Sequence, residues 1–229
     1  MKVLIIIPAY NEEESIEKVI NNLKQNYSQY DYVINNDGSH DHTSEICHKN
    51  KYKIIDLPVN LGLTGAFQTG LKYAYKKGYD YAIQFDADGQ HLPEYIPAMV
   101  DKIEEGYDMV IGSRFVEKPK PRSLRMLGSR VISTAIKITT GVHIADPTSG
   151  MRLFNKTLIK EFAENINYEP EPDTVSFLIK QGVKVAEVQV EMKEREAGES
   201  YLNLSRSIVY MTKMFVSIII LQNFRNRKK

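Results

Sequence analysis

Apolar, strand-like runs alternate with amphipathic, helix-like segments through the first half of the chain, and this alternation constrains the fold more than any other feature. Residues 2–7 form a nearly continuous apolar run, as in a strand that is buried on both faces. Residues 12–25 follow with apolar side chains at helical spacing. Further strands are predicted at 32–35, 53–57, 81–85 and 109–111, and further helices at 43–49, 64–77 and 93–105. The pattern predicts an α/β fold with a mostly parallel sheet and helices on both faces.

The second half of the chain is less regular. A basic segment at 118–130 predicts a loop that enters a helix near Ser123, and this helix runs to about Thr140. A turn at 146–150, a short strand, helices near 156–164 and 173–181 and a strand at 184–191 follow. Neither a repeat nor a linker interrupts the 229 residues, which suffice for one well-buried domain. We predict a single α/β domain over residues 1–200 and an amphipathic helix over 201–229.

Composition excludes several classes of protein. With 42% hydrophobic and 26% charged residues, the chain is neither disordered nor collagen-like. Cys47 is the single cysteine, so an internal disulfide cannot form. The start Met1-Lys2, with its short apolar run, lacks the layout of a signal peptide. Both features predict a cytoplasmic protein.

Positive charge gathers at the C-terminus. The net charge is only +1, yet the residues after Glu199 include basic side chains and no acidic ones; the basic ones are Arg206, Lys213, Arg225, Arg227, Lys228 and Lys229. The apolar residues there lie near helical spacing, in a run far shorter than the roughly 20 residues that span a bilayer. Two interpretations stay open: the helix lies at an anionic membrane surface, or it packs against the body or a subunit. The acidic body lacks a basic, aromatic stripe, which argues against nucleic acid as a partner.

Two carboxylates follow the predicted fourth strand. Asp86 and Asp88 stand at i and i+2 just as the apolar run 81–85 ends, and Gly89 allows a turn that directs both toward one point. Carboxylate oxygens beside open coordination positions suit a hard divalent ion that keeps waters and shares diphosphate oxygens. The sequence therefore predicts an Mg²⁺ or Mn²⁺ site, and a plain surface turn is the alternative.

Two further strand ends carry polar residues to the same edge of the predicted sheet. The first strand leads into Pro8, Tyr10 and Glu12, and the second leads into Asp37. Because ligands of such sheets bind beyond the carboxyl ends of the strands, these residues predict a continuous cleft. The sequence contains none of the known glycine-rich phosphate loops, so nucleotide binding here would depend on a metal.

Six motifs, taken together, resemble those of the inverting family 2 glycosyltransferases, which have the GT-A (Rossmann-like) fold. They are Pro8-Ala9-Tyr10-Asn11-Glu12, Asn36-Asp37-Gly38-Ser39, Asn60-Leu61-Gly62, Asp86-Ala87-Asp88-Gly89-Gln90-His91, Gly112-Ser113-Arg114 and Asp146-Pro147-Thr148-Ser149-Gly150. Within that family the chain is most similar to the branch of dolichyl-phosphate mannose synthases and bacterial polyprenyl-phosphate glycosyltransferases. The resemblance extends from about Lys2 to Ser200.

The resemblance implies roles for the matching residues. It implies that the nucleotide is bound by Pro8, Tyr10, Glu12, Asp37 and Asp86, and the metal by Asp86, Asp88 and Gln90. It implies that the catalytic residues are Asp88, Arg114 and Arg125, and that the acceptor phosphate is held by Arg125, Arg130, Arg195 and Ser200. Two positions, Leu63 and Gly89, depart from residues that are common in relatives, so the donor is not determined by the motifs.

The implied reaction moves a hexose from a nucleotide sugar to a polyprenyl phosphate at the cytosolic leaflet, for cell-surface glycan synthesis. UDP-glucose or UDP-N-acetylglucosamine is favoured as the donor, and GDP-mannose stays open. A phosphate monoester, with a second pKa near 6, is already a nucleophile at cytosolic pH, so it needs cations rather than a base. The basic loop at 118–130 offers such cations, and a solvated surface loop is the alternative.

Two other functions stay open. The same fold could act on a sugar hydroxyl in polysaccharide assembly, with Glu171 or Asp173 as the general base. The chain could also be a non-catalytic scaffold that binds nucleotides at the membrane. Many relatives in this branch end in transmembrane helices that this chain lacks, so a small membrane-protein anchor is a further candidate partner. Assembly into a homo-oligomer is left open.

Overall fold

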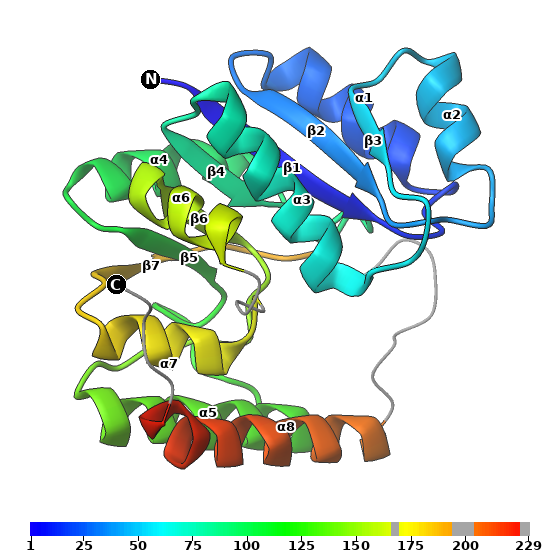
Figure 1. Ribbon diagram of the computed structural model, residues 1–229. Helices are drawn as coiled ribbons and strands as arrows, with labels where there is room; N and C mark the ends of the chain where they lie inside the picture. Colours follow the sequence, from blue (N-terminus) through cyan, green and yellow to red (C-terminus); the bar gives the residue numbers. More distant parts are fainter. Residues whose placement is uncertain (166–169, 194–203, 225–229) are drawn as a thin grey trace.

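One seven-stranded sheet forms the centre of the computed structural model of the chain (Figure 1), which describes residues 1–165, 170–193 and 204–224. The strands are β1 (Val3–Ala9), β2 (Asp31–Asn36), β3 (Ile54–Asp56), β4 (Tyr81–Gln84), β5 (Met109–Ser113), β6 (Arg152–Asn155) and β7 (Val185–Gln189). Their order across the sheet is β3-β2-β1-β4-β6-β5-β7. Only β6 runs antiparallel to its neighbours, β4 and β5, so the predicted mixed, mostly parallel sheet is confirmed.

Helices cover both faces of the sheet, as the alternating pattern predicts. They are α1 (Ile16–Asn26), α2 (Thr43–Lys49), α3 (Gly62–Lys77), α4 (Ile96–Glu104), α5 (Leu124–Thr140), α6 (Lys156–Glu164), α7 (Pro172–Lys180) and α8 (Leu204–Ile219). Alternate residues of β1 divide between two cores: Leu4 and Ile6 pack with α3, α6, α7 and α8, whereas Ile5 and Ile7 pack with α1, α2 and α4. A strand buried on both sides explains why residues 2–7 are apolar without interruption.

Several element boundaries differ from the sequence prediction for local reasons. Helix α1 begins at Ile16, not at residue 12, because the backbone N–H groups of Ser15 and Ile16 both donate to the carbonyl of Glu12 and close a turn first. The predicted helix at 93–105 begins as a 3-10 turn, Pro93–Tyr95, before α4. Pro97 lacks the N–H that would donate to the carbonyl of Pro93, which prevents an α-helical first turn.

The C-terminal helix packs on the body rather than standing apart from it. Helix α8 lies side by side with α5 along one edge of the molecule (Figure 1), and both contact α7. Met214 and Ile218 of α8 are buried in the core that α5 and α7 share. The helix ends at Ile219, within the predicted range 201–229, and a 3-10 turn, Leu221–Asn223, follows it. Within the described ranges, no helix is both long and apolar enough to cross a bilayer.

Candidate active site

The carboxylate pair lies on the loop after β4, near the centre of the sheet edge. Gly89 has a φ of 76°, the left-handed conformation that glycine adopts without strain, and it turns the chain immediately after Asp88. Asp88 is buried and its Oδ1 accepts the backbone N–H of Gln90 at 3.0 Å. The side chain of Asp86 stays 36% exposed. One carboxylate is thus built into the loop and the other faces the edge of the sheet where ligands of this fold class bind.

Gly150 makes room for the carboxylate of Asp86. This glycine ends the loop that precedes β6, and β6 pairs directly with β4. A Cβ atom at position 150 would lie 3.1 Å from Oδ2 of Asp86 and 3.5 Å from the ring of His91. A larger residue there would fill the space beside the carboxylate, so the loop at 146–150 forms one wall of the site.

The donor set around Asp86 fits a hard divalent ion. No group of three histidine, cysteine, aspartate or glutamate side chains positioned to hold a metal occurs in the described part of the chain. Asp86 and Asp88 stand two residues apart on one loop, and a pair of carboxylates suits Mg²⁺ or Mn²⁺, which keep waters and bind substrate phosphates. Gln90 donates its amide N–H to the carbonyl of Lys193 at 3.3 Å, which leaves its amide oxygen as the candidate ligand. Metal binding by Asp86, Asp88 and Gln90 stays a prediction.

The loops after β1 and β2 are tied together into a rigid rim. The backbone N–H of Asn11 donates to Oγ of Ser39 at 3.0 Å, and Oδ1 of Asn11 accepts the N–H of His40 at 2.9 Å. The N–H of Glu12 donates to Oγ1 of Thr43 at 2.8 Å. These reciprocal bonds join two segments that lie 28 to 31 residues apart in sequence. A nucleotide would meet a preformed surface there.

Four of the five predicted nucleotide residues lie at this rim, and the fifth, Asp86, is on the loop after β4. Pro8 is in β1 beside Asn35 of β2, and Tyr10 is 42% exposed with its ring edge-on to His40. The carboxylate of Glu12 accepts the hydroxyl of Ser15 at 2.6 Å. Asp37 is buried, and its Oδ1 accepts the N–H of Leu61 at 2.7 Å. The strand order β2-β1-β4 places them next to the loop of Asp86. Their role in binding a nucleotide stays a prediction.

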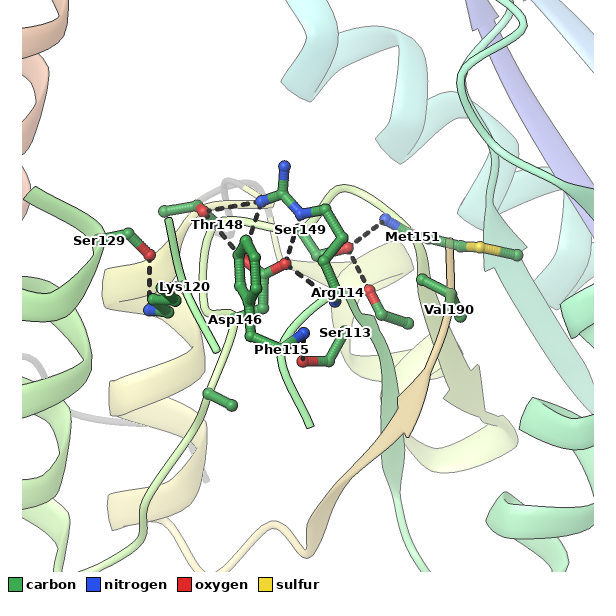
Figure 2. Close-up of polar contacts among 12 residues, drawn as sticks. Ser113, Arg114, Phe115, Lys120, Ser129, Asp146, Thr148, Ser149, Met151 and Val190 are labelled. Atoms are coloured by element: carbon green, nitrogen blue, oxygen red, sulfur yellow. Dashed lines mark hydrogen bonds and ion pairs between the residues drawn. The ribbon is translucent and has the colours of Figure 1, made fainter. Parts of the chain in front are cut away.

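Arg114 directly follows β5, and the buried carboxylate of Asp146 fixes its side chain (Figure 2). Its Nε and Nη2 donate to the two oxygens of Asp146, at 2.6 and 2.9 Å, and Nη2 also reaches Thr148 at 3.4 Å. Burial raises the pKa of Asp146, but the hydrogen bonds and charge of Arg114 outweigh this effect and hold that pKa below its usual range. Glu187 of β7 accepts the backbone N–H groups of Ala145 and Asp146, at 2.6 and 2.8 Å. Arg114 is therefore held in one orientation.

The basic loop after β5 is fastened to α5. Nζ of Lys120 donates to the hydroxyls of Ser129 and Ser133, at 2.8 and 3.1 Å (Figure 2 draws the first of these). In return, Arg130 donates to the carbonyls of Lys120 and Pro121, at 2.6 and 3.2 Å. Burial lowers the pKa of Lys120. Arg130 thus holds the loop in place through Nη2. The family resemblance implies that this same residue binds the acceptor phosphate.

Three predicted acceptor residues lie beyond what the structure describes. Arg195 and Ser200 fall in 194–203, outside the described residues. The backbone of Arg125 belongs to the first turn of α5, but its side chain is also outside them. Their part in holding a phosphate, and the catalytic part assigned to Arg125, stay predictions from the sequence.

Comparison with known proteins decides the family. The sequence profile of glycosyl transferase family 2 matches residues 4–162, which include the rim, the loop of Asp86 and the loop at 146–150. The chain belongs to glycosyl transferase family 2. The glycosyltransferase is 33% identical to the UDP-N-acetylglucosamine–dolichyl-phosphate N-acetylglucosaminyltransferase of Methanococcus voltae over 213 residues, 82% of this chain and 84% of that protein. It is 29% identical to the undecaprenyl-phosphate mannosyltransferase of Micrococcus luteus, over 93% of each chain.

Solved structures agree with the predicted GT-A fold. The glycosyltransferase superimposes with a TM-score of 0.70 on glucosyl-3-phosphoglycerate synthase from Mycobacterium tuberculosis, which was solved with Mn²⁺, UDP-glucose and phosphoglyceric acid. The match covers 99% of this chain and 81% of that one at 17% identity. The similarity at this level of identity establishes the shared fold.

Several structural residues of the site were not assigned a role from the sequence. Asp146 and Gly150 belong to a motif that the resemblance includes, but their partners are Arg114 and Asp86, far away in sequence. Glu187 lies in a strand and gives no local signal. A turn rich in small and polar residues just before a short strand is the one pattern that could have pointed to the wall at 146–150.

Proposed function

We propose that this glycosyltransferase transfers a hexose from a nucleotide sugar to a polyprenyl phosphate at the cytosolic face of a membrane. The observation that carries the proposal is the loop after β4, where Asp86 faces the ligand-binding edge of the sheet beside buried Asp88. The relatives named above as dolichyl- and undecaprenyl-phosphate transferases, over more than four-fifths of this chain, support the class of acceptor. As the donor, we propose UDP-glucose or UDP-N-acetylglucosamine ahead of GDP-mannose.

The leaving diphosphate is the group that needs stabilisation. Mg²⁺ or Mn²⁺, held by Asp86 and Asp88, would supply neutralisation of the charge that develops on it. Arg114 adds a fixed positive charge at the same edge of the sheet. Asp146 engages its Nε and Nη2, and no hydrogen bond among the described residues uses its Nη1. A preorganised donor of this kind contributes roughly 10²–10³ in rate.

The acceptor phosphate needs no general base. An anionic phosphate oxygen forms the new bond to the anomeric carbon, while the bond from that carbon to the diphosphate oxygen breaks and its electron pair leaves with the diphosphate. Because the attacking oxygen is already deprotonated at cytosolic pH, no proton has to be removed. Attack opposite the leaving group inverts the anomeric centre. We assign Arg125, Arg130 and Arg195 to the acceptor phosphate.

The contacts of Glu171 and Asp173 disfavour the alternative with a hydroxyl acceptor. Glu171 accepts the hydroxyl of Tyr210, and Oδ2 of Asp173 accepts from Ser217 and Gln222, at 2.7 and 3.0 Å. These carboxylates therefore fasten the C-terminal helix to α7. A general base has to present a free oxygen to the hydroxyl proton, within hydrogen-bond reach. Fixed polar contacts of this kind suit a structural role better than a catalytic one.

The paired helices α5 and α8 offer a surface for the membrane. Leu127, Val131 and Ile138 follow one side of α5 at helical spacing, and all three are exposed. Val209 and Val216 of α8 are exposed in the same way. Basic residues at the C-terminus complement an anionic lipid surface. This surface would place the enzyme where a polyprenyl phosphate lies.

A partition assay tests the proposed function. The protein is incubated with Mn²⁺, undecaprenyl phosphate and radiolabelled UDP-glucose, UDP-N-acetylglucosamine or GDP-mannose, and label is counted in the organic phase. We expect labelled lipid with at least one donor, and loss of it in Asp88→Asn. Asp101→Asn, at an exposed position of α4, is the matched control and keeps full transfer. Absence of labelled lipid with all three donors would reject the proposal.

A further inference from the structure

His91 makes an unusual contact with the backbone of Asp86. Its side chain is 3% exposed, and its Nδ1 accepts the backbone N–H of Asp86 at 2.9 Å. A ring nitrogen that accepts a hydrogen bond carries no proton, so the proton of the neutral ring is on Nε2. His91 is therefore held as the Nε2–H tautomer by the residue whose carboxylate it faces.

The other ring nitrogen, Nε2, which carries the proton of the neutral ring, lies near the carboxylate of Asp86. Nε2 of His91 lies 3.6 Å from Oδ2 of Asp86. On another side, Gly150 leaves room for this oxygen, because a Cβ atom at position 150 would lie 3.1 Å from it and 3.5 Å from Cε1 of the ring. Oδ2 of Asp86 thus lies beside the N–H group of His91, in space that a residue larger than glycine at position 150 would reduce.

Neighbouring contacts hold the ring itself in place. Phe85 packs edge-on against it, with ring centroids 5.5 Å apart. The backbone of His91 forms a β-bridge with Met192, and the N–H of Lys193 donates to the carbonyl of Gln90 at 3.0 Å. The segment after β7 therefore anchors the ring that orients Asp86.

We propose that His91 is a positioning residue that orients Asp86 for metal binding, and that it does so without touching the metal. The inference rests on the proposed function, because it presumes that Asp86 is a metal ligand. Groups that hydrogen-bond a metal ligand from behind typically change metal affinity by about 10- to 100-fold when they are removed. His91 occupies that place through two separate contacts, one to the backbone and one near the carboxylate of Asp86.

Isosteric variants separate the contacts of His91. The side-chain oxygen of Asn can replace Nδ1 as the acceptor for the N–H of Asp86, the amide nitrogen of Gln can replace Nε2–H, and Phe replaces neither. The dissociation constant of Mn²⁺ in the presence of UDP is measured from the electron paramagnetic resonance signal of free Mn²⁺. Thermal unfolding followed by circular dichroism reports whether each variant folds.

We expect His91→Phe to weaken Mn²⁺ binding about 10- to 100-fold. His91→Asn is expected to recover most of that loss, because it restores the shorter of the two contacts. If His91→Phe fails to fold, His91→Gln takes its place, since with its amide nitrogen at the position of Nε2 it has no acceptor at the position of Nδ1. Wild-type affinity in the variants without this acceptor would overturn the inference, as would equal losses in His91→Asn and His91→Phe at wild-type thermal stability.

Asp86→Asn distinguishes failure of this inference from failure of the proposed function. If Asp86→Asn abolishes Mn²⁺ binding while His91→Phe leaves it unchanged, Asp86 is a ligand and only the role of His91 is wrong. If Asp86→Asn binds Mn²⁺ as tightly as the wild type, the metal site is not at Asp86, and the proposed function and the inference both fail.

Discussion

Asp146 shows how one buried residue supports the site by holding another residue in place. Its side chain is fully buried and its two oxygens bind the guanidinium of Arg114. A buried carboxylate persists as a charge only when a partner of this quality compensates for the loss of water. The orientation of Arg114 at the sheet edge therefore depends on a residue 32 positions later in the chain.

The first prediction concerns this pair. Arg114→Met removes the partner of a buried charge and is expected to lower the free energy of unfolding at pH 7 by about 3–5 kcal/mol. In the wild type, the pKa of Asp146 lies below its unfolded value, so its contribution is present above that value and is lost as the pH falls through the folded pKa. In the variant, the carboxylate lacks its partner and takes up a proton more readily. The gap between the two proteins should therefore narrow as the pH falls from 7 toward 4.

Urea unfolding at several pH values measures that gap. Lys118→Met is the matched control, because Lys118 pairs with Glu191 on the surface, where both side chains are mostly exposed, and exposed pairs contribute about 1 kcal/mol or less. A gap for Arg114→Met that stays constant from pH 7 to pH 4 would contradict the role assigned to Asp146.

At the scale of the elements, helix α8 is specified by polar contacts as well as by apolar packing. Its Tyr210 and Ser217 reach Glu171 and Asp173 at the start of α7. Arg152 of β6 is buried in the same region and donates to the carbonyls of Ser149 and Pro147, each at 2.9 Å. These contacts give α8 a fixed place on the body and connect that place to the loop at 146–150.

The second prediction tests this attachment. Tyr210→Phe removes a hydrogen bond to a carboxylate, and such bonds contribute about 1.5–3 kcal/mol. We expect a loss of that size in the free energy of unfolding, together with faster amide exchange in α8. Lys213→Ala, at an exposed position of the same helix, should change the stability by less than about 0.5 kcal/mol. Equal stability of Tyr210→Phe and the wild type would show that the hydrogen bond to Glu171 does not help to hold α8.

The elements were predictable from periodicity, but their directions and contacts were only partly so. Residues 43–49 and 156–164 form helices with the expected bounds. In the second helix, apolar residues recur at helical spacing and Asn155 caps the first turn. The antiparallel direction of β6 was not predictable, since alternation gives the kind of element and not the path of the chain between elements. The contact of Gly150 with Asp86 escaped for the same reason.

At the scale of the whole molecule, the ligand-binding edge and the α5–α8 surface belong to one fold. Both are connected through the loop at 146–150: Asp146 orients Arg114, and Gly150 borders Asp86. Arg152, directly after this loop, also donates to the carbonyl of Glu171 at 3.4 Å, next to the attachment of α8. The proposed acceptor, part lipid and part phosphate, would need both regions in a fixed arrangement, and this fold carries both.

The third prediction concerns the membrane surface proposed for α5 and α8. Ile138→Glu places a charge on the exposed side of α5, and it is expected to reduce sedimentation of the protein with vesicles of 70% phosphatidylcholine and 30% phosphatidylglycerol. Val209→Glu should do the same from α8. Val59→Glu, at an exposed position in the loop before α3, is the matched control and should not change binding. Equal losses in all three variants would indicate repulsion by added charge rather than a defined surface.

The position of the metal is the central claim, and anomalous diffraction at the manganese edge measures that position directly. Crystals grown with Mn²⁺ and UDP should give one strong anomalous peak within coordination distance, about 2.0–2.3 Å, of a carboxylate oxygen of Asp86 or Asp88 and of the diphosphate. The same crystals of Asp88→Asn should show a weakened peak or none. A manganese peak elsewhere on the protein, or UDP bound with no peak beside these carboxylates, would contradict the account.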